Sequence, residues 1–207
     1  MNAIDQRAPA ITFYTAIPGC RSPIRADPSV LGTLPARGFQ YCEALRAASS
    51  FGWYVFPPID FTLQWDGSQV IWTYRGAKAW YPLTSAQFPG YQARFDRIAP
   101  RRLRGFSPPF LTAMTEPGIV QVWTGLMIES TEDWSVLVRP PANLPRNLAY
   151  DLYEASSRPT AGSARSSPIS ALSRPTGRST SAPRFHWCRC NPCTAARMPT
   201  KCSRISA

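Results

Sequence analysis

Apolar and polar residues alternate in short runs over the first three quarters of the chain, which is the pattern of half-buried β-strands. The runs are rich in aromatic and β-branched residues, and Pro, Gly or charged residues separate them. Apolar residues at helical spacing also predict two short helices, over residues 40–49 and 90–98. The alternating runs predict strands over residues 11–16, 53–56, 61–65, 69–74, 119–128 and 134–139, and a further strand from residue 148.

Two pairs of neighbouring runs are predicted to form β-hairpins. Asp66-Gly67 lies between the runs 61–65 and 69–74, and an Asp-Gly pair favours the tight turn in which both central residues have positive φ. The polar segment 129–133 links the last two runs in a similar way. Short strands and hairpins predict a mainly β fold, an antiparallel sandwich or barrel with short helices. The helices leave an α+β fold as the alternative.

Composition changes sharply after Glu154. The 207 residues carry 23 Lys and Arg against 12 Asp and Glu, for a net charge of +11. Residues 1–154 hold 14 of the basic residues and all 12 acids, whereas residues 155–207 hold nine basic residues, no acid and two of the 25 aromatic residues. Few large apolar side chains remain there to offset the entropy of ordering the chain. We therefore predict a truncated β-rich domain over residues 1–154 and a disordered basic tail over residues 155–207.

Translation out of frame would explain this tail. If one base is lost after Glu154, the middle base of each original codon is the first base of the codon now read at that position. Codons with U in the middle encode only Phe, Leu, Ile, Met or Val, so every Cys, Phe, Trp and UCN-encoded Ser becomes apolar when the frame is restored. The tail holds 11 Ser, four Cys, one Phe and one Trp, which gives 17 apolar positions in 53 residues. That density is typical of a folded domain.

Two other interpretations of the tail remain open. A basic tail rich in Ser and Pro can bind nucleic acid by neutralising phosphates. Its end also offers His186, Cys188, Cys190, Cys193 and Cys202 as ligands for zinc. The spacing of these cysteines lacks the second matching pair of a typical zinc site, so we predict no metal site there.

Several strings of the first part stand in a recognisable order and spacing. They are GTLPAR at residues 32–37, FGWYVFPP at 51–58, WDG at 65–67, AQFPG at 86–90, GFSPPFLTA at 105–113, QVWTG at 121–125 and VRPPANLP at 138–145. Together they resemble an uncharacterised bacterial family, a domain of unknown function, over residues 11–154. The resemblance implies a continuation like EGIIETDRWFGPLFTNIR and a later strand like VQVQP. Both return when residues 154–171 and 188–192 are read in the restored frame, although the resemblance also guided the choice of codons.

The first part offers little material for common catalytic sites. The chain has a single His, His186, and it lies in the tail, so residues 1–154 can build neither a Ser-His-Asp triad nor a His-containing metal site. They also contain no glycine-rich phosphate loop. We therefore favour a protein that is not an enzyme and that needs no cofactor. The alternative is a His-independent enzyme that uses Arg139 and acidic side chains, namely Glu43, Asp60, Asp96 and Glu116.

Aromatic and strand-end side chains are the candidates for ligand binding. Trp65 and Trp123 lie in predicted strands, where an indole can bind a flat ligand, although a place in the core is the commoner role. Arg139 ends a strand before Pro140, with Asn143 nearby, and could hold an anionic ligand. We expect a small ligand or a protein as the partner, no membrane, and a cytoplasmic location, where Cys20 and Cys42 stay reduced. A net charge of +2 over residues 1–154 argues against nucleic acid binding.

Overall fold

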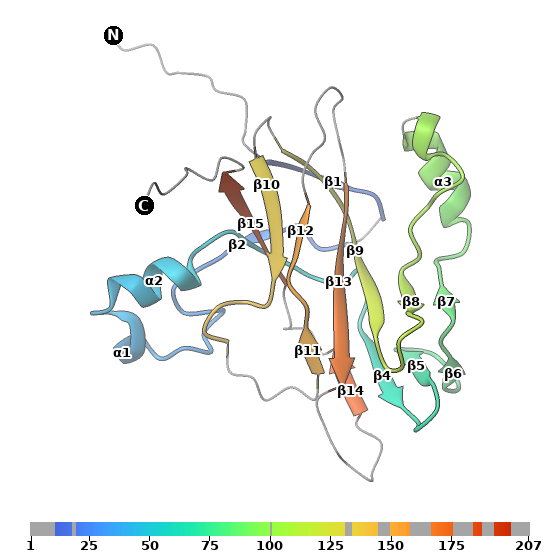
Figure 1. Cartoon of the computed structure of the whole chain (residues 1–207), viewed down its shortest axis with the longest axis horizontal. Helices are drawn as coiled ribbons and strands as arrows, with labels where there is room; N and C mark the ends of the chain where they lie inside the picture. Colours follow the sequence, from blue (N-terminus) through green and yellow to red (C-terminus); the bar gives the residue numbers. More distant parts are fainter. Residues whose placement is uncertain are drawn as a thin grey trace, which may run out of the picture.

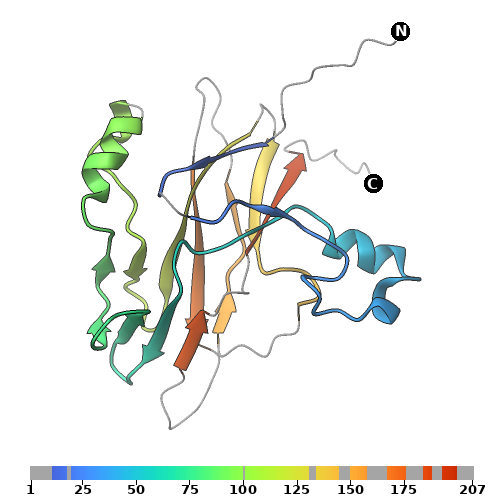
Figure 2. The same cartoon turned by 180° about the vertical axis from the view of Figure 1, so that it is seen from behind.

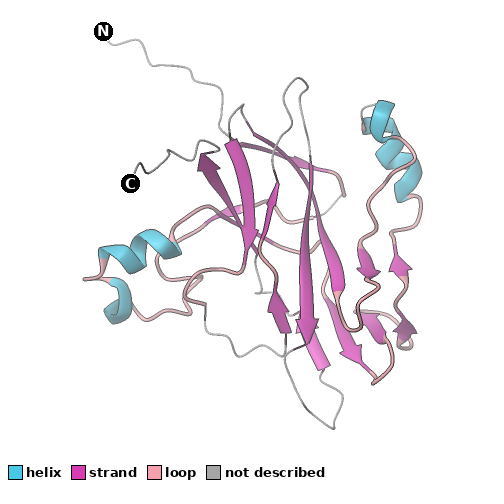
Figure 3. Ribbon diagram, viewed as in Figure 1, coloured by secondary structure: helices cyan, strands magenta, loops and turns pink. Residues whose placement is uncertain are grey.

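A computed structural model describes residues 11–17, 20–99, 101–130, 134–144, 150–157, 167–175, 184–187 and 193–199. Within these residues the fold is mainly β, with three open sheets and a few short helices (Figure 3). Every strand pair of the described residues is antiparallel. The predicted fold class is therefore confirmed. None of the described helices is both long and apolar enough to cross a membrane.

The first sheet is built around the long strand β9 (Val120–Ser130). One edge of β9 pairs with β8 (Leu111–Ala113) and then with β1 (Ile11–Thr15), and β7 (Ser85–Ala86) continues the sheet beyond β8. The other edge pairs with β13 (Ser167–Pro175), which is followed by β11 (Tyr150–Leu152). Strand β9 thus occupies the centre of the sheet (Figure 1).

The other two sheets flank the first. The second sheet runs β12 (Ala155–Ser157), β10 (Trp134–Arg139), β15 (Cys193–Pro199), β3 (Trp53–Val55) and β2 (Ile24–Arg25). The third sheet runs β14 (Arg184–Trp187), β4 (Phe61–Trp65), β5 (Val70–Tyr74) and β6 (Tyr81–Pro82). Helices α1 (Ala36–Phe39) and α2 (Glu43–Ser49) lie on one side of the sheets, and α3 (Tyr91–Ile98) lies on the opposite side (Figure 2).

Apolar side chains from neighbouring elements form the core. Val120 and Val122 of β9 pack with Phe61 and Leu63 of the third sheet. Further along β9, Leu126 and Ile128 pack with Val55, Val136 and Val138 of the second sheet. Trp123 and Met127 of β9 pack with Tyr91 and Phe95 of α3. Both faces of β9 are therefore buried over residues 122–128, which explains why the apolar residues 126–128 are consecutive and do not alternate with polar ones.

Gly125 lies where β9 passes from pairing with β8 to pairing with β1. Its φ of +78° lies in the left-handed region that favours glycine, and its carbonyl oxygen accepts a hydrogen bond from the N–H of Ala16. A Cβ added at this position would lie only 3.1 Å from Ile17 Cδ1. This close approach and the positive φ explain why a glycine stands at this position of a buried strand.

The structure confirms one predicted hairpin and corrects the other. Strands β4 and β5 pair as predicted, but Trp65 lies opposite Val70, so residues 66–69 form a four-residue connection. Gly67 has positive φ (107°) and Asp66 does not, so the turn is not the tight turn that the Asp-Gly pair predicts. Asp66 caps this loop by accepting hydrogen bonds from the N–H groups of Ser68 and Gln69. The second predicted hairpin is wrong, because β9 and β10 lie in different sheets.

Four described strands, β12 to β15, fall in the segment that the sequence predicts to be disordered. Strand β13 lies between β9 and β11, and β15 lies between β10 and β3, so the first part of the chain leaves two gaps that each take one strand. Open strand edges present backbone N–H and C=O groups, which can pair with an extended segment whatever its side chains are. The rest of residues 158–207 lies outside the described residues.

Candidate functional site

Backbone strain marks one region of the molecule. Among the described residues, three residues other than glycine have positive φ: Val30 (52°), Leu31 (56°) and Asn143 (61°). Such conformations cost free energy, most of all for a β-branched side chain such as Val30, and they often occur at functional sites. Val30 and Leu31 lie in the loop between β2 and α1, and Asn143 lies in the loop after β10. Both loops run on the side of the sheets that carries α2 (Figure 1).

The carboxylate of Asp27 holds the first loop in its strained conformation. It accepts hydrogen bonds from the hydroxyl and the N–H of Ser29, the latter at 2.8 Å, and from the N–H of Leu31 at 3.1 Å. Burial alone would raise the pKa of the Asp27 carboxyl, but hydrogen bonds from the Ser29 side chain and from backbone N–H groups outweigh burial and lower it. Asp27 therefore stays ionised and organises the loop around its negative charge.

Tyr54 of β3 lies beside this loop and is 1% exposed. Burial and, to a smaller extent, the charge of Asp27 raise the pKa of the Tyr54 hydroxyl. The hydroxyl therefore stays protonated at neutral pH and can donate a hydrogen bond. Tyr54 thus adds a neutral polar group to the region that Asp27 organises.

Asn143 connects the second loop to α2. Its Nδ2 donates a hydrogen bond of 2.9 Å to the Oγ of Ser49, which is 3% exposed at the end of the helix. Asparagine tolerates the left-handed conformation better than most residues, which suits it to this position. The side-chain oxygen of Asn143 is the acceptor group that this contact does not use.

Arg139 brings a positive charge to the same region. Arg139 and Tyr54 are both opposite Thr194 in register, so their side chains leave the second sheet on the same face, two strands or about 10 Å apart. The Nε of Arg139 is buried and has no hydrogen-bond partner among the described residues. A buried N–H of a guanidinium without a partner costs free energy, so this group is suited to bind an acceptor from outside the protein.

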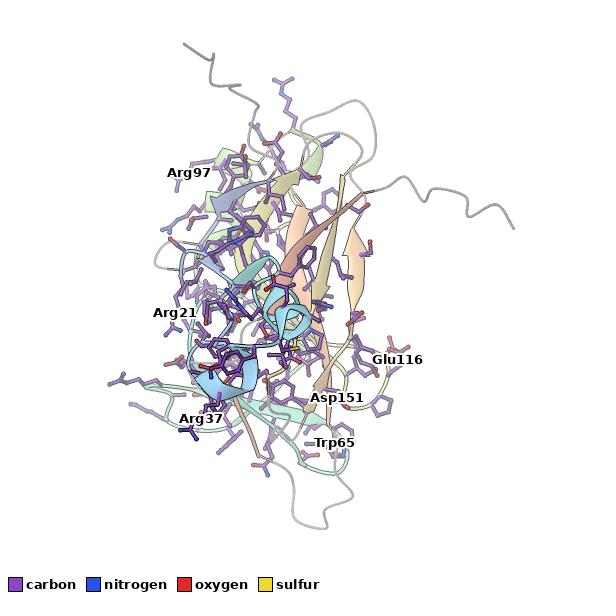
Figure 4. The ribbon with its side chains drawn as sticks, turned by 90° about the vertical axis from the view of Figure 1, so that its left-hand side faces the viewer. Arg21, Arg37, Trp65, Arg97, Glu116 and Asp151 are labelled. Carbon is purple, nitrogen blue, oxygen red and sulfur yellow. The ribbon has the colours of Figure 1, made fainter. Side chains whose placement is uncertain are left out.

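The four residues predicted for ligand binding do not form one site. Arg139 and Asn143 belong to the region described above. Trp123 is completely buried, its ring packs on Tyr91, and its indole N–H donates to the Leu126 carbonyl oxygen at 3.1 Å, so it is a core residue. Trp65 is half-buried at the far end of β4, and Figure 4 shows it well away from Arg21 and Arg97.

Two of the acidic residues of the alternative enzyme hypothesis, Glu43 and Asp96, lie far apart. Glu43 lies in α2, where its carboxylate is 3.8 Å from the guanidinium of Arg46. Asp96 lies in α3, on the opposite side of the sheets (Figure 2). These two carboxylates therefore cannot act on one substrate. The described residues also contain no group of three or more His, Cys, Asp or Glu side chains that could hold a metal ion.

The structure describes the backbone of two of the five tail ligands of the zinc hypothesis. His186 and Cys193 lie in β14 and β15, which belong to different sheets. Cys188, Cys190 and Cys202 lie outside the described residues. In the first part of the chain, Cys20 and Cys42 are free thiols.

Sequence reasoning missed Asp27 and Tyr54. Asp27-Pro28-Ser29 contains residues that favour a turn capped by a side chain, so the capped loop could have been predicted. The strain at Val30 and Leu31 could not, because both residue types avoid positive φ. No sequence signal distinguishes Tyr54 from the other residues of its short aromatic strand.

The lowered pKa of Asp27 predicts how the stability of its loop depends on pH. Because folding lowers this pKa, the carboxylate stabilises the fold above about pH 4, the value in an unfolded chain, and this contribution is lost as the pH falls through the folded pKa. We expect Asp27→Asn to be less stable at neutral pH and to lose less stability than the parent chain between about pH 5 and 3. Acid unfolding followed by tryptophan fluorescence checks this. Parallel pH profiles for the two proteins would contradict it.

Comparison with family models, with curated proteins and with solved structures gave no significant match. The resemblance to an uncharacterised bacterial family therefore stays a prediction from the strings of the sequence.

Proposed function

We propose that this chain is a copy of a cytoplasmic bacterial binding domain, with a ligand site at Arg139 and with its C-terminal segment read out of frame. The ligand is a small molecule that carries an acidic group, and the domain catalyses no reaction. The cytoplasmic location is supported by the free thiols of Cys20 and Cys42. Bacterial origin rests on the resemblance.

The observation that carries the ligand site is the buried Nε of Arg139, which has no partner among the described residues. A carboxylate or phosphate would accept its hydrogen bond and balance its charge. The strained residue Asn143 follows four positions later and is fixed to Ser49, so the loop beside Arg139 is held in place. A rigid loop next to this Nε favours binding, because little conformational entropy is lost when the ligand arrives.

Replacing Arg139 tests this site. We expect inorganic phosphate or succinate to change the intrinsic fluorescence of the protein in a saturable way, and Arg139→Met to weaken that binding about tenfold or more, since a charged hydrogen bond is lost. Arg75→Met removes the same charge from an exposed position at the end of β5 and should have no effect. Absence of saturable binding, or equal affinity in both variants, would contradict the proposal.

The register of β13 supports the out-of-frame reading. Ser167, Ser170 and Ser173 lie opposite Ile128, Trp123 and Val120, respectively. These three residues of β9 are at most 4% exposed. A central strand would normally place apolar residues at such positions. If the three serines have UCN codons, all three positions become apolar in the restored frame.

Prolines in the tail strands support the same proposal. Pro168 lies inside β13, which occupies a central position between β9 and β11, and the pairing shifts register between Pro168 and Ser170. Proline cannot donate a hydrogen bond to a neighbouring strand and is rare in central strands. The tail therefore occupies positions in the sheets for which its residues are poorly suited.

A further inference from the structure

The positive charge of the first part of the chain is concentrated in one short segment. Residues 91–106 carry five arginines and one acid, Asp96, for a net charge of +4. Residues 1–154 as a whole have a net charge of +2, so the remainder of that part carries −2. The segment comprises α3 and the short 3-10 helix η1 (Arg101–Leu103), which stand apart from the second sheet and from α2 (Figure 1).

The arginines of this segment are exposed, whereas its apolar helix face is not. Tyr91 and Phe95 are each 3% exposed and attach α3 to Trp123 and Met127. The arginines at positions 94, 97, 101, 102 and 104 all lie at the surface. Figure 4 shows Arg97 at the end of the molecule opposite Trp65. The packing of α3 therefore presents its basic residues to solvent.

Hydrogen bonds hold α3 and the arginine-bearing turn together. The Asp96 carboxylate accepts hydrogen bonds from Gln92 Nε2 at 2.9 Å and from the N–H of Gly105 at 2.8 Å. These bonds lower the pKa of Asp96, with a smaller contribution from the charge of Arg104. The side chain of Arg104 also donates to the Ala99 carbonyl oxygen at 3.4 Å. The single acid of the segment therefore serves to fix the arrangement of the basic surface.

Two large apolar side chains project from the same segment. Phe106 is 76% exposed and Ile98 is 61% exposed, which are high values for such residues. Phe106 follows Arg104 by two positions, so an exposed aromatic side chain belongs to the same turn as the arginines. Aromatic rings that stack on bases, together with basic groups that contact phosphates, are the features by which proteins bind single-stranded nucleic acid.

We propose that α3 and the turn over residues 101–106 form a surface that binds single-stranded nucleic acid, with the arginines on phosphates and Phe106 stacked on a base. An anionic membrane is a poorer match, because Tyr91 and Phe95 are buried in the protein and Ile98 is the one large apolar side chain that α3 exposes, which is too little for a helix to insert into lipid. This proposal departs from the expectation drawn from the net charge alone, because +2 is the sum of a strongly basic segment and an acidic remainder.

Fluorescence anisotropy with a labelled single-stranded oligonucleotide of about 12 nucleotides tests the proposal on the full chain. The variant Arg94→Gln/Arg97→Gln/Arg101→Gln should bind roughly tenfold more weakly at low salt, and its salt slope should fall by about 2. The variant Arg37→Gln/Arg75→Gln/Lys78→Gln removes the same charge from exposed positions elsewhere and should bind like the parent chain. Both variants keep the basic tail, so a difference in their affinity for the oligonucleotide is due to the surface formed by α3 and residues 101–106.

Phe106→Ala separates base stacking from charge. We expect this variant to lose about fivefold or more in affinity for the oligonucleotide with an unchanged salt slope. Equal affinity of the two triple variants would overturn the proposal, as would an unchanged affinity of Phe106→Ala. A third outcome would also overturn the proposal. If the variant Arg94→Gln/Arg97→Gln/Arg101→Gln binds vesicles of anionic phospholipid more weakly than the parent chain but binds the oligonucleotide equally well, the surface is a membrane contact.

Discussion

Restoring the reading frame after Glu154 is expected to turn a poorly soluble or rapidly degraded chain into a monomer that melts cooperatively. The first part of the chain leaves two central strand positions open, and β13, which fills one of them, places serines and a proline opposite buried residues. An imperfectly filled sheet exposes apolar surface and strand edges, which promotes aggregation and proteolysis. Strands with apolar residues at these positions would bury that surface.

Expression of the two chains side by side measures this effect. The frame-restored protein should give the higher soluble yield, elute as a monomer from a size-exclusion column and show a cooperative thermal melt by circular dichroism. The matched control is a chain in which residues 155–207 are shuffled, since it keeps length and composition. A chain with the present tail that is already monomeric and melts cooperatively would contradict this prediction.

Trp123→Ala is expected to destabilise the frame-restored protein by about 3–5 kcal/mol, among the largest effects of a single core substitution. Trp123 is completely buried between Tyr91 and the rest of β9, and its indole N–H is hydrogen-bonded to Leu126. Removing the side chain leaves a cavity and removes this hydrogen bond to the Leu126 carbonyl oxygen. Urea unfolding followed by circular dichroism measures the loss.

Trp80→Ala is the matched control, because Trp80 is 39% exposed. We expect it to cost about 1 kcal/mol or less, as surface substitutions usually do. Trp123→Phe should recover a large part of the stability, since a ring still fills most of the space. Similar losses for Trp123→Ala and Trp80→Ala would show that Trp123 is not a central core residue.

Local patterns in the sequence predicted the strands well but not their partners. The alternation in residues 61–65 and 69–74 and the intervening Asp66-Gly67 were sufficient to predict the hairpin of β4 and β5, because strand and turn signals lie within a few residues. The same reasoning failed for β9 and β10. Strand β9 is buried on both faces and pairs with β1, more than 100 residues away, and no local signal predicts such pairing.

Some residues of the candidate site could be predicted from the sequence and others could not. Arg139 and Asn143 could be proposed from the sequence because a strand end before two prolines is a common place for a binding group. From the sequence, Trp123 could be a ligand-binding residue or a core residue. The structure shows that it is a core residue, because it packs with Tyr91 and Phe95. The contribution of Asp27 and Tyr54 depends on a strained loop, whose conformation results from tertiary packing and not from residue preference.

Sequencing the gene from the codon for Tyr153 through the end of the tail is the most direct test of the account. We predict that one base is missing just after the codon for Glu154, that the tail serines have UCN codons, and that the restored frame stays open past the codon for Ser173. Serines with AGY codons, together with stop codons in the restored frame, would contradict the account and show that the tail is a genuine part of the protein.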